Sequence, residues 1–392
     1  MLPLAGITVI TLEQAVAAPL ASRHLADWGA RVIKVERPGG GDFARAYDTT
    51  VKGLASHFVW LNRGKESLTL DLKHAEARQV LIRLIERADV FLQNLVPGAP
   101  ERLGFGAKQL RERWPRLVTC GISGYGTSGA YRDKKAYDLL IQAESGIINT
   151  TGTEKTPSKI GVSIADIATG MYAHSGILTA LLARHQTGEG AELEVSMLEA
   201  LGEWMGFPAY YTAYGGTPPP RGGAHHATIA PYGPFEVGDG RSMFIAVHSD
   251  REWVSFCEMV LQAPALAIDP RFATTALRSE NRNEVRAVVE TAFAELTGGE
   301  VEQRLERAQT AYAELRSIQG FVDHPQLKER NRFRWIGSPV GPLWALLPPV
   351  TFEGLEPAMG DIPAAGAHTD AILGELGYTA AEIERLHTTG AV

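Results

Sequence analysis

The chain has 392 residues and a formal net charge of −7, with 38 Lys and Arg against 45 Asp and Glu. This acidic balance argues against nucleic acid or an anionic membrane as a general partner, and an apolar content of 45% excludes disorder over most of the chain. The two cysteines, Cys120 and Cys257, exclude a disulfide framework and a cysteine-rich metal site.

Strands and helices alternate over the first third of the chain. Strands are predicted from β-branched, alternating or short apolar runs at 6–12, 31–35, 67–72, 89–92 and 117–121. Helical spacing of apolar residues predicts helices over 19–28 and 75–88. This alternation implies right-handed crossovers and a mostly parallel sheet, which is an α/β, Rossmann-like fold. Because no glycine directly follows the first strand and no P-loop is present, NAD and ATP are disfavoured as ligands.

The rest of the chain predicts a second set of elements. Helices are expected at 168–185, 197–204, 253–262, 283–296, 300–308 and 369–388. Strands are expected at 192–195, 232–237 and 242–248, and the Pro-rich stretch 339–349 suits an extended linking segment. We therefore expect a large Rossmann-like domain over 1–223, a smaller α+β domain over 224–330, and a C-terminal segment, 331–392, that returns to the large domain.

Membrane, targeting and metal-binding signals are missing from the sequence. The N-terminus has no basic start, and no run approaches the roughly 20 apolar residues of a membrane span. We therefore expect a cytoplasmic protein that is not bound to a membrane. The eleven histidines include the adjacent pair His225 and His226 but no spacing typical of a zinc or iron site, so no metal is predicted.

Asp166 is the most interesting single candidate for chemistry. It lies between an apolar stretch and the long helix predicted from residue 168. An Asp in this position is a natural N-cap, which would be a structural role. Alternatively, the start of a helix stabilises a carboxylate that acts as a nucleophile.

Motifs spread over nearly the whole chain resemble the family III CoA-transferases, the CaiB/BaiF group. In chain order the segments are Leu4–Ile10, Ala18–Pro19, Leu25–Pro38 with Gly41 and Asp42, Asn62–Lys73, Ala88–Ala99 with Arg102 to Gly104, Tyr137–Asp138, Asp166–Met171 and Arg184–Gly190. Each segment is a weak signal alone, whereas their order and spacing together are specific.

The resemblance implies an enzyme that moves CoA between carboxylic acids. It implies an interlocked homodimer in which Asp166 matches the catalytic aspartate and forms an aspartyl anhydride and an aspartyl-CoA thioester. The CoA thioester is a substrate, and no permanently bound cofactor is expected. The positions that match CoA contacts are Arg37, Leu70, Lys73, Arg102 and Lys135.

The resemblance also bears on the choice of substrate. Racemases of this family carry a histidine where this chain has Tyr137, before Asp138, and a tyrosine is a poor general base at neutral pH. The segment from Arg221 to Tyr232 resembles the branch that acts on C4–C5 dicarboxylic acids such as succinate, mesaconate, itaconate or malate. Formyl-CoA/oxalate enzymes carry a tetraglycine loop and a glutamine at the place of Val16, and both are missing here.

Several alternatives stay open at this point. They are intramolecular transfer between the two carboxyls of mesaconyl-CoA, a 2-methylacyl-CoA racemase, a formyl-CoA/oxalate-type transferase, and an inactive CoA-binding regulatory relative. The expected substrate pocket consists of Val16, Tyr47, His57, Tyr137, Asp138, Arg221, His225 and His226.

Overall fold

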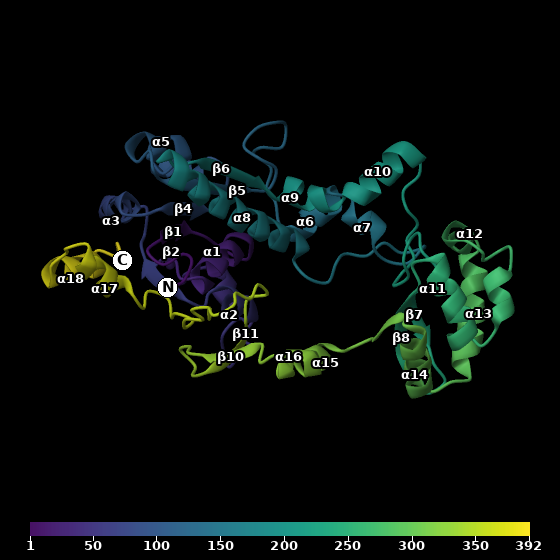
Figure 1. Cartoon of the computed structure of the whole chain (residues 1–392). Coiled ribbons are helices and arrows are strands. Elements are labelled where there is room, and N and C mark those ends of the chain that lie inside the picture. The colour runs from purple at the N-terminus through teal and green to yellow at the C-terminus, as the bar shows by residue number, and fades with distance from the viewer. The chain divides into compact units, whose positions relative to one another are not determined.

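The computed structural model describes residues 1–392 and divides into two compact units (Figure 1). Unit 1 comprises residues 1–145, 160–205 and 326–392, and unit 2 comprises residues 146–159 and 206–325. None of the helices combines the length and the apolar character that crossing a membrane requires.

Unit 1 is built on a six-stranded parallel sheet. Its strands are β1 (Thr8–Leu12), β2 (Arg31–Glu36), β3 (Lys65–Thr69), β4 (Val90–Gln93), β5 (Val118–Ser123) and β6 (Glu192–Ser196). They lie in the order β3-β2-β1-β4-β5-β6, and every neighbouring pair is parallel. This order is that of the doubly wound dinucleotide-binding fold, in which the direction of winding reverses between β1 and β4.

Unit 1 also contains helices and short helical turns, several of which bury apolar faces against this sheet. They are α1 (Ala17–Asp27), the 3₁₀ turn η1 (Phe43–Ala46), α2 (Ser56–Leu61), α3 (Ala75–Glu86), α4 (Ala99–Leu103), α5 (Ala107–Arg113), α6 (Asp138–Glu144), α8 (Ile164–Thr187), α9 (Met197–Trp204), α17 (Thr369–Glu375) and α18 (Ala380–Thr388). In α3, residues Val80, Leu81, Leu84 and Ile85 share one face and are buried, because 3.6 residues complete each turn.

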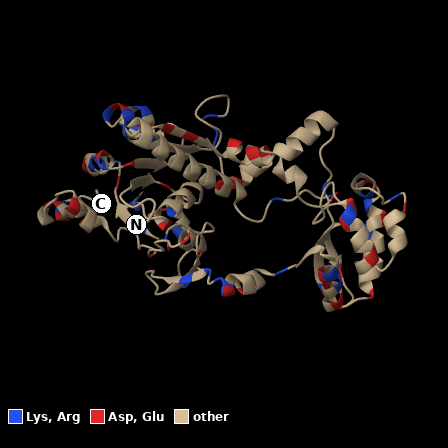
Figure 2. Ribbon diagram, viewed as in Figure 1, with Lys and Arg blue, Asp and Glu red and all other residues tan.

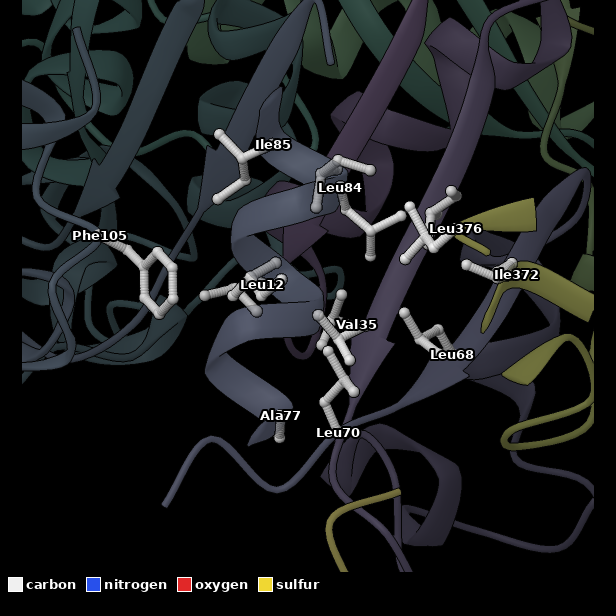
Figure 3. Close-up of a cluster of buried hydrophobic side chains, with 14 of the residues drawn as sticks. Leu12, Val35, Leu68, Leu70, Ala77, Leu84, Ile85, Phe105, Ile372 and Leu376 are labelled. Atoms are coloured by element: carbon white, nitrogen blue, oxygen red, sulfur yellow. The ribbon is translucent and has the colours of Figure 1, made fainter. Parts of the chain in front are cut away.

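The C-terminal helices complete the core on one side of the sheet. Ile372 of α17 and Leu376, which follows the end of that helix, pack with Leu68 of β3 and Val35 of β2 in the cluster of Figure 3. The tail therefore returns to unit 1. The free Cys120 of β5 is buried in the core on the other side of the sheet.

Unit 2 has its own sheet and core. Strands β7 (Tyr232–Glu236), β8 (Ser242–Ala246) and β9 (Ala311–Glu314) form an antiparallel sheet. The remaining elements are α7 (Ile147–Thr150), α10 (Gly206–Gly215), α11 (Asp250–Ser255), the π-helical turn η2 (Phe256–Val260), the 3₁₀ turn η3 (Pro264–Ile268), α12 (Thr275–Glu280), α13 (Arg282–Ala294), α14 (Gly298–Ala308) and α15 (Ile318–Val322). The free Cys257 lies in this core.

The predicted α/β fold with a Rossmann-like sheet is confirmed, and two predicted elements are wrong. The single helix expected at 369–388 is two helices, α17 and α18, which are separated by residues 376–379. The stretch 339–349 is not a plain extended link, because β11 (Leu343–Leu346) pairs with β10 (Phe333–Ile336) in an antiparallel hairpin; the short α16 (Pro325–Glu329) precedes it. Residues 146–159 and 206–223 belong to unit 2, although the predicted boundary lies at 223. One reason is that Gly223 N–H donates to Gly152 O, which ties the two segments together. The predicted boundaries themselves stay predictions.

Candidate active site

Most of the predicted site residues lie just after the carboxyl ends of the parallel strands. Val16 follows β1, Arg37 follows β2, and Leu70 and Lys73 follow β3. Similarly, Arg102 lies beyond β4, and Lys135, Tyr137 and Asp138 lie beyond β5. Ligands of open α/β sheets bind at this edge, at the point where the winding reverses.

The loops after β1 and β4 are joined at that reversal point. Gln14 N–H donates to Asn94 Oδ1 at 2.9 Å, and Asn94 Nδ2 donates back to Gln14 O at 2.8 Å. Val16 follows at once and packs in a small apolar cluster with Leu20, Leu61 and Ile167. Because Ile167 is the neighbour of Asp166, this cluster lies beside the candidate nucleophile.

Asp166 is in the first turn of α8 but does not cap it. The helix begins at Ile164, its N-cap position is Ser163, and the side chain of Asp138 accepts from Ala165 N–H at 2.8 Å and from Asp166 N–H at 3.3 Å. The N-cap role considered for Asp166 is therefore wrong, because a carboxylate from α6 fills it. The local sequence could not predict this cap, because Asp138 lies 28 residues before Asp166 in the chain.

The Asp166 carboxylate accepts no hydrogen bond from the chain, and its pKa is strongly perturbed. Burial, and to a smaller extent the charge of Asp138, raise the pKa of Asp166 from the ordinary 3.8 to about 7. The helix start would favour the ionised form, so burial and the like charge outweigh the helix dipole here. A carboxyl pKa raised in this way by burial and a neighbouring charge is typical of a reactive group.

Aromatic side chains approach the same carboxylate. Burial raises the pKa of Tyr47 to about 12, with smaller contributions from the charges of Asp42, Asp166 and Tyr137. The ring of Tyr47 meets that of His57 edge-on, with centroids 5.5 Å apart. His57 Nδ1 is buried and has no hydrogen-bond partner in the chain, so this nitrogen is left unsatisfied. Six predicted residues thus come together: Val16, Tyr47, His57, Tyr137, Asp138 and Asp166.

A buried network of charges lies beneath this group. Lys34 Nζ is 2.8 Å from Asp42 Oδ2 and 3.4 Å from Glu13 Oε1, and Lys65 Nζ is 2.7 Å from Glu13 Oε1, with all four side chains fully buried. Asp42 also accepts from the N–H of Ala15, at 3.1 Å, and begins η1, which leads to Tyr47. The network thus fixes the backbone beside Val16 and Tyr47.

Sequence patterns did not reveal this network. Lys34 falls within the β-branched run of β2, and Asp42 follows three glycines. The available signal was the presence of charged residues inside otherwise apolar strand patterns, since such side chains are rarely buried unless they are paired.

Four of the five predicted CoA contacts are solvent-accessible. Arg37, Lys73, Arg102 and Lys135 are exposed. Leu70 is different: it is 1% exposed and packs in the core of Figure 3, so its side chain presents no surface to an adenine ring. Basic and acidic residues are interspersed along the ribbon (Figure 2).

The remaining predicted residues belong to unit 2. Arg221 donates to Thr153 O, Asn149 O and Glu154 O, and so clamps the neighbouring segment. His225 packs edge-on against Phe235, and His226 stacks on Tyr232. The pKa of each histidine is lowered, first by burial and then by nearby positive charges. No group of three or more His, Cys, Asp or Glu side chains is placed to hold a metal ion.

Comparison with known proteins gives consistent family matches. The family model described as CoA-transferase family III matches residues 4–369. A CaiB/BaiF family protein from Brucella suis, of known structure, is 31% identical, with a TM-score of 0.83, and the match covers 96% of this chain and 99% of that one.

Two curated relatives have named activities. A succinyl-CoA:glutarate CoA-transferase of Mus musculus is 30% identical over 100% of this chain and 91% of its own length. An acetyl-CoA:oxalate CoA-transferase of Acetobacter aceti is 33% identical over 84% of this chain and 85% of its own length. The family resemblance predicted from the motifs is therefore confirmed: the chain belongs to CoA-transferase family III and is a transferase.

Proposed function

We propose that this enzyme transfers CoA between short-chain dicarboxylic acids and that Asp166 is its covalent nucleophile. The observation that carries the proposal is the Asp166 carboxylate, which is partly buried and accepts no hydrogen bond from the chain. A structural carboxylate in such a place would be paired or hydrogen-bonded. A carboxylate without such partners is free to attack an acyl group.

The chemistry balances without any other reagent. A carboxylate oxygen of Asp166 attacks the thioester carbonyl, the C–S bond breaks, and CoA leaves as the thiolate. The thiolate then attacks the Asp166 carbonyl of the anhydride, which releases the first acid and leaves an aspartyl-CoA thioester. The acceptor carboxylate reverses both steps, which regenerates Asp166 and yields the new CoA thioester.

The surroundings of Asp166 suit this reaction. Val16, Leu20 and Ile167 form an apolar wall beside the carboxylate, which would limit hydrolysis of the anhydride by water. In the proposal, Tyr47 and His57 line the acyl side, and Arg37, Lys73, Arg102 and Lys135 contact the phosphates of CoA. CoA is a substrate, and the enzyme acts as a homodimer in the cytoplasm.

The dicarboxylate class is supported by the resemblance of the segment 221–232 and by the relatives' named activities. Glutarate and oxalate are both dicarboxylic acids, so oxalate belongs among the acceptors to be tested beside succinate, mesaconate, itaconate and malate. A donor–acceptor matrix of these acids, run with and without free acid, also separates intermolecular transfer from intramolecular transfer on mesaconyl-CoA.

The direct test is to trap the acyl-enzyme. After incubation with succinyl-CoA, hydroxylamine is expected to convert Asp166 to a hydroxamate that peptide mass spectrometry locates. Asp166→Ala should lose the adduct and the transferase activity, whereas Asp370→Ala, at the exposed start of α17, should keep both. If a panel of acyl-CoAs leaves Asp166 unmodified in the wild-type protein, the covalent mechanism is wrong. Deuterium incorporation at the α-carbon of a 2-methylacyl-CoA would instead identify a racemase.

A further inference from the structure

Unit 2 contains a cavity of about 570 Å³. Its walls come from the segment 153–155, from the loop that leads into β7, and from the first two turns of α13. Four positively charged side chains line the cavity: Lys155, Arg221, Arg282 and Arg286. The only negatively charged side chain that lines it is Glu154. In a chain with a net charge of −7, four cations around one cavity are an uneven distribution.

Two of these guanidinium groups are held without a counter-charge. Arg221 donates to the carbonyl oxygens of Thr153, Asn149 and Glu154. These acceptors satisfy its hydrogen bonds but are neutral, so the positive charge remains uncompensated.

Arg282 is bound in the same way. It donates to Ala227 O at 2.7 Å, to Ser279 O at 2.9 Å and to Ser279 Oγ at 3.2 Å. A guanidinium has five N–H donors, so two of its N–H groups remain unused by these three bonds. Neither Arg221 nor Arg282 forms an ion pair with a carboxylate of the chain.

The other two cations have free donors. Arg286 uses its Nε to pair with Glu290 at 2.6 Å and keeps both terminal nitrogens unbonded. Lys155 is exposed and forms no hydrogen bond or ion pair. Their positions at the cavity wall leave these groups able to bind directly to a ligand.

The positive charges around the cavity also affect the pKa values of its two histidines, His225 and His226. Burial is the largest cause that lowers the pKa of both histidines. The next cause is the charge of Arg286 for His225, and the charges of His248 and Arg282 for His226. Both rings are therefore neutral at pH 7 and add hydrogen-bonding groups to the cavity without adding charge.

We propose that this cavity is an oxyanion-binding site in which Lys155 and Arg286 contact the ligand directly and Arg221 and Arg282 supply a fixed positive field. Its ligand is a carboxylate of an acid substrate or a phosphate group of CoA, two sources of the same chemistry. The site is defined within unit 2 alone and does not depend on the role of Asp166. Only the choice of glutarate as a probe rests on the proposed function.

The test is isothermal titration of the full-length protein with glutarate and, separately, with inorganic phosphate, at constant ionic strength and without acyl-CoA. Wild-type protein should bind at least one of them. Lys155→Gln and Arg286→Gln should each weaken that binding at least fivefold, and the double variant should weaken it further. Arg241→Gln is the matched control, because Arg241 is a half-buried arginine of unit 2 that pairs with Asp239 and lies outside the cavity; it should change binding less than twofold.

Each outcome decides between clear alternatives. Binding of glutarate assigns the site to an acid carboxylate, and binding of phosphate alone assigns it to a CoA phosphate; both support the proposal. The proposal is overturned if wild-type protein binds neither anion, if the two cavity variants bind as well as wild type, or if Arg241→Gln loses as much affinity as they do. The hydroxylamine experiment on Asp166 is independent, so failure of one proposal is distinguishable from failure of the other.

Discussion

At the scale of single residues, two carboxylates at the start of α8 have different tasks. Asp138 is hydrogen-bonded: it accepts from two backbone N–H groups of α8 and from Gln142 Nε2 at 2.7 Å. Asp166 is unbonded, and its pKa of about 7 reflects burial and the proximity of Asp138. Separate environments for neighbouring carboxylates are a common means of assigning them different chemical roles.

This pair predicts the pH dependence of acylation. Since the ionised form of Asp166 attacks, the single-turnover rate at which succinyl-CoA is consumed should rise with pH, with a midpoint near 7. Asp138→Asn keeps the carbonyl oxygen that accepts from α8 but removes the charge, so it should shift the midpoint to lower pH. Because burial is the larger cause, the shift should be partial. Rapid-quench measurements between pH 5 and 9 check this, and an unchanged midpoint in the variant would contradict it.

The same raised pKa predicts a cost in stability. The folded state binds the Asp166 proton more tightly than the unfolded state, so the stabilising contribution is present below about pH 4 and is lost as pH rises through about 7. Asp166→Asn should therefore raise the free energy of unfolding by more than about 1 kcal/mol at pH 8. Little change is expected at pH 4. Urea denaturation at the two pH values measures the difference, and equal effects at both would contradict the linkage.

At the scale of elements, the buried charges fix the loops that surround the site. Lys34 extends from β2 to Asp42 and Glu13, and Lys65 extends from β3 to Glu13 and to Pro19 O at 3.0 Å. These contacts hold the segment between β1 and α1 and the start of η1. The network explains why charged residues occur within motifs whose strand pattern is otherwise apolar.

Breaking this network should be costly. Lys34→Met leaves Asp42 and part of the Glu13 charge buried without a partner, and the expected loss is about 3–5 kcal/mol in the free energy of unfolding. Arg31→Met is the control on the same strand, since Arg31 pairs with Glu66 and Glu375 near the surface. Arg31→Met should lower the free energy of unfolding by at most about 1 kcal/mol. Chemical denaturation measures both variants. Comparable losses would show that the buried network contributes no more to stability than the surface ion pairs of Arg31.

Sequence patterns predicted the regular elements better than the contacts between them. The β-branched, alternating and short apolar runs identified the six strands of unit 1, and burial leaves a strong apolar signal in the inner strands β1, β2 and β4. The hairpin of β10 and β11 escaped detection since its prolines suggested an extended link. Asp138 lies 27 and 28 residues before the two N–H groups of α8 that donate to it, so local spacing could not predict its role.

At the scale of the whole molecule, α10 presents a large apolar surface. No residue of this ten-residue helix is buried, and Tyr214 is 86% exposed, Tyr210 69% and Phe207 55%. Contiguous exposed apolar surface of this kind typically marks a protein–protein contact. It supports the homodimer that the family resemblance implies.

Sedimentation measurements provide the test of that dimer. The wild-type protein should sediment at about twice the chain mass of 42.4 kDa. Replacing Tyr210 and Tyr214 together by Ser should raise the dimer dissociation constant at least tenfold. Tyr312→Ser, at a tyrosine of β9 that is 37% exposed, should not. A wild-type monomer at micromolar concentration would contradict the proposal.

Both sulfhydryl groups of the enzyme are sequestered, in the separate cores of the two units. Cys120 and Cys257 are buried, and burial raises the pKa of each thiol to about 12. Neither supplies appreciable thiolate at neutral pH, and thiolate is the form that reacts with disulfide reagents. Ellman's reagent added to the native protein should therefore detect only the CoA released on acylation. Reagent that captures this thiolate before it attacks the anhydride would then record the first half-reaction as a colour change in the wild-type enzyme, without removing a cysteine.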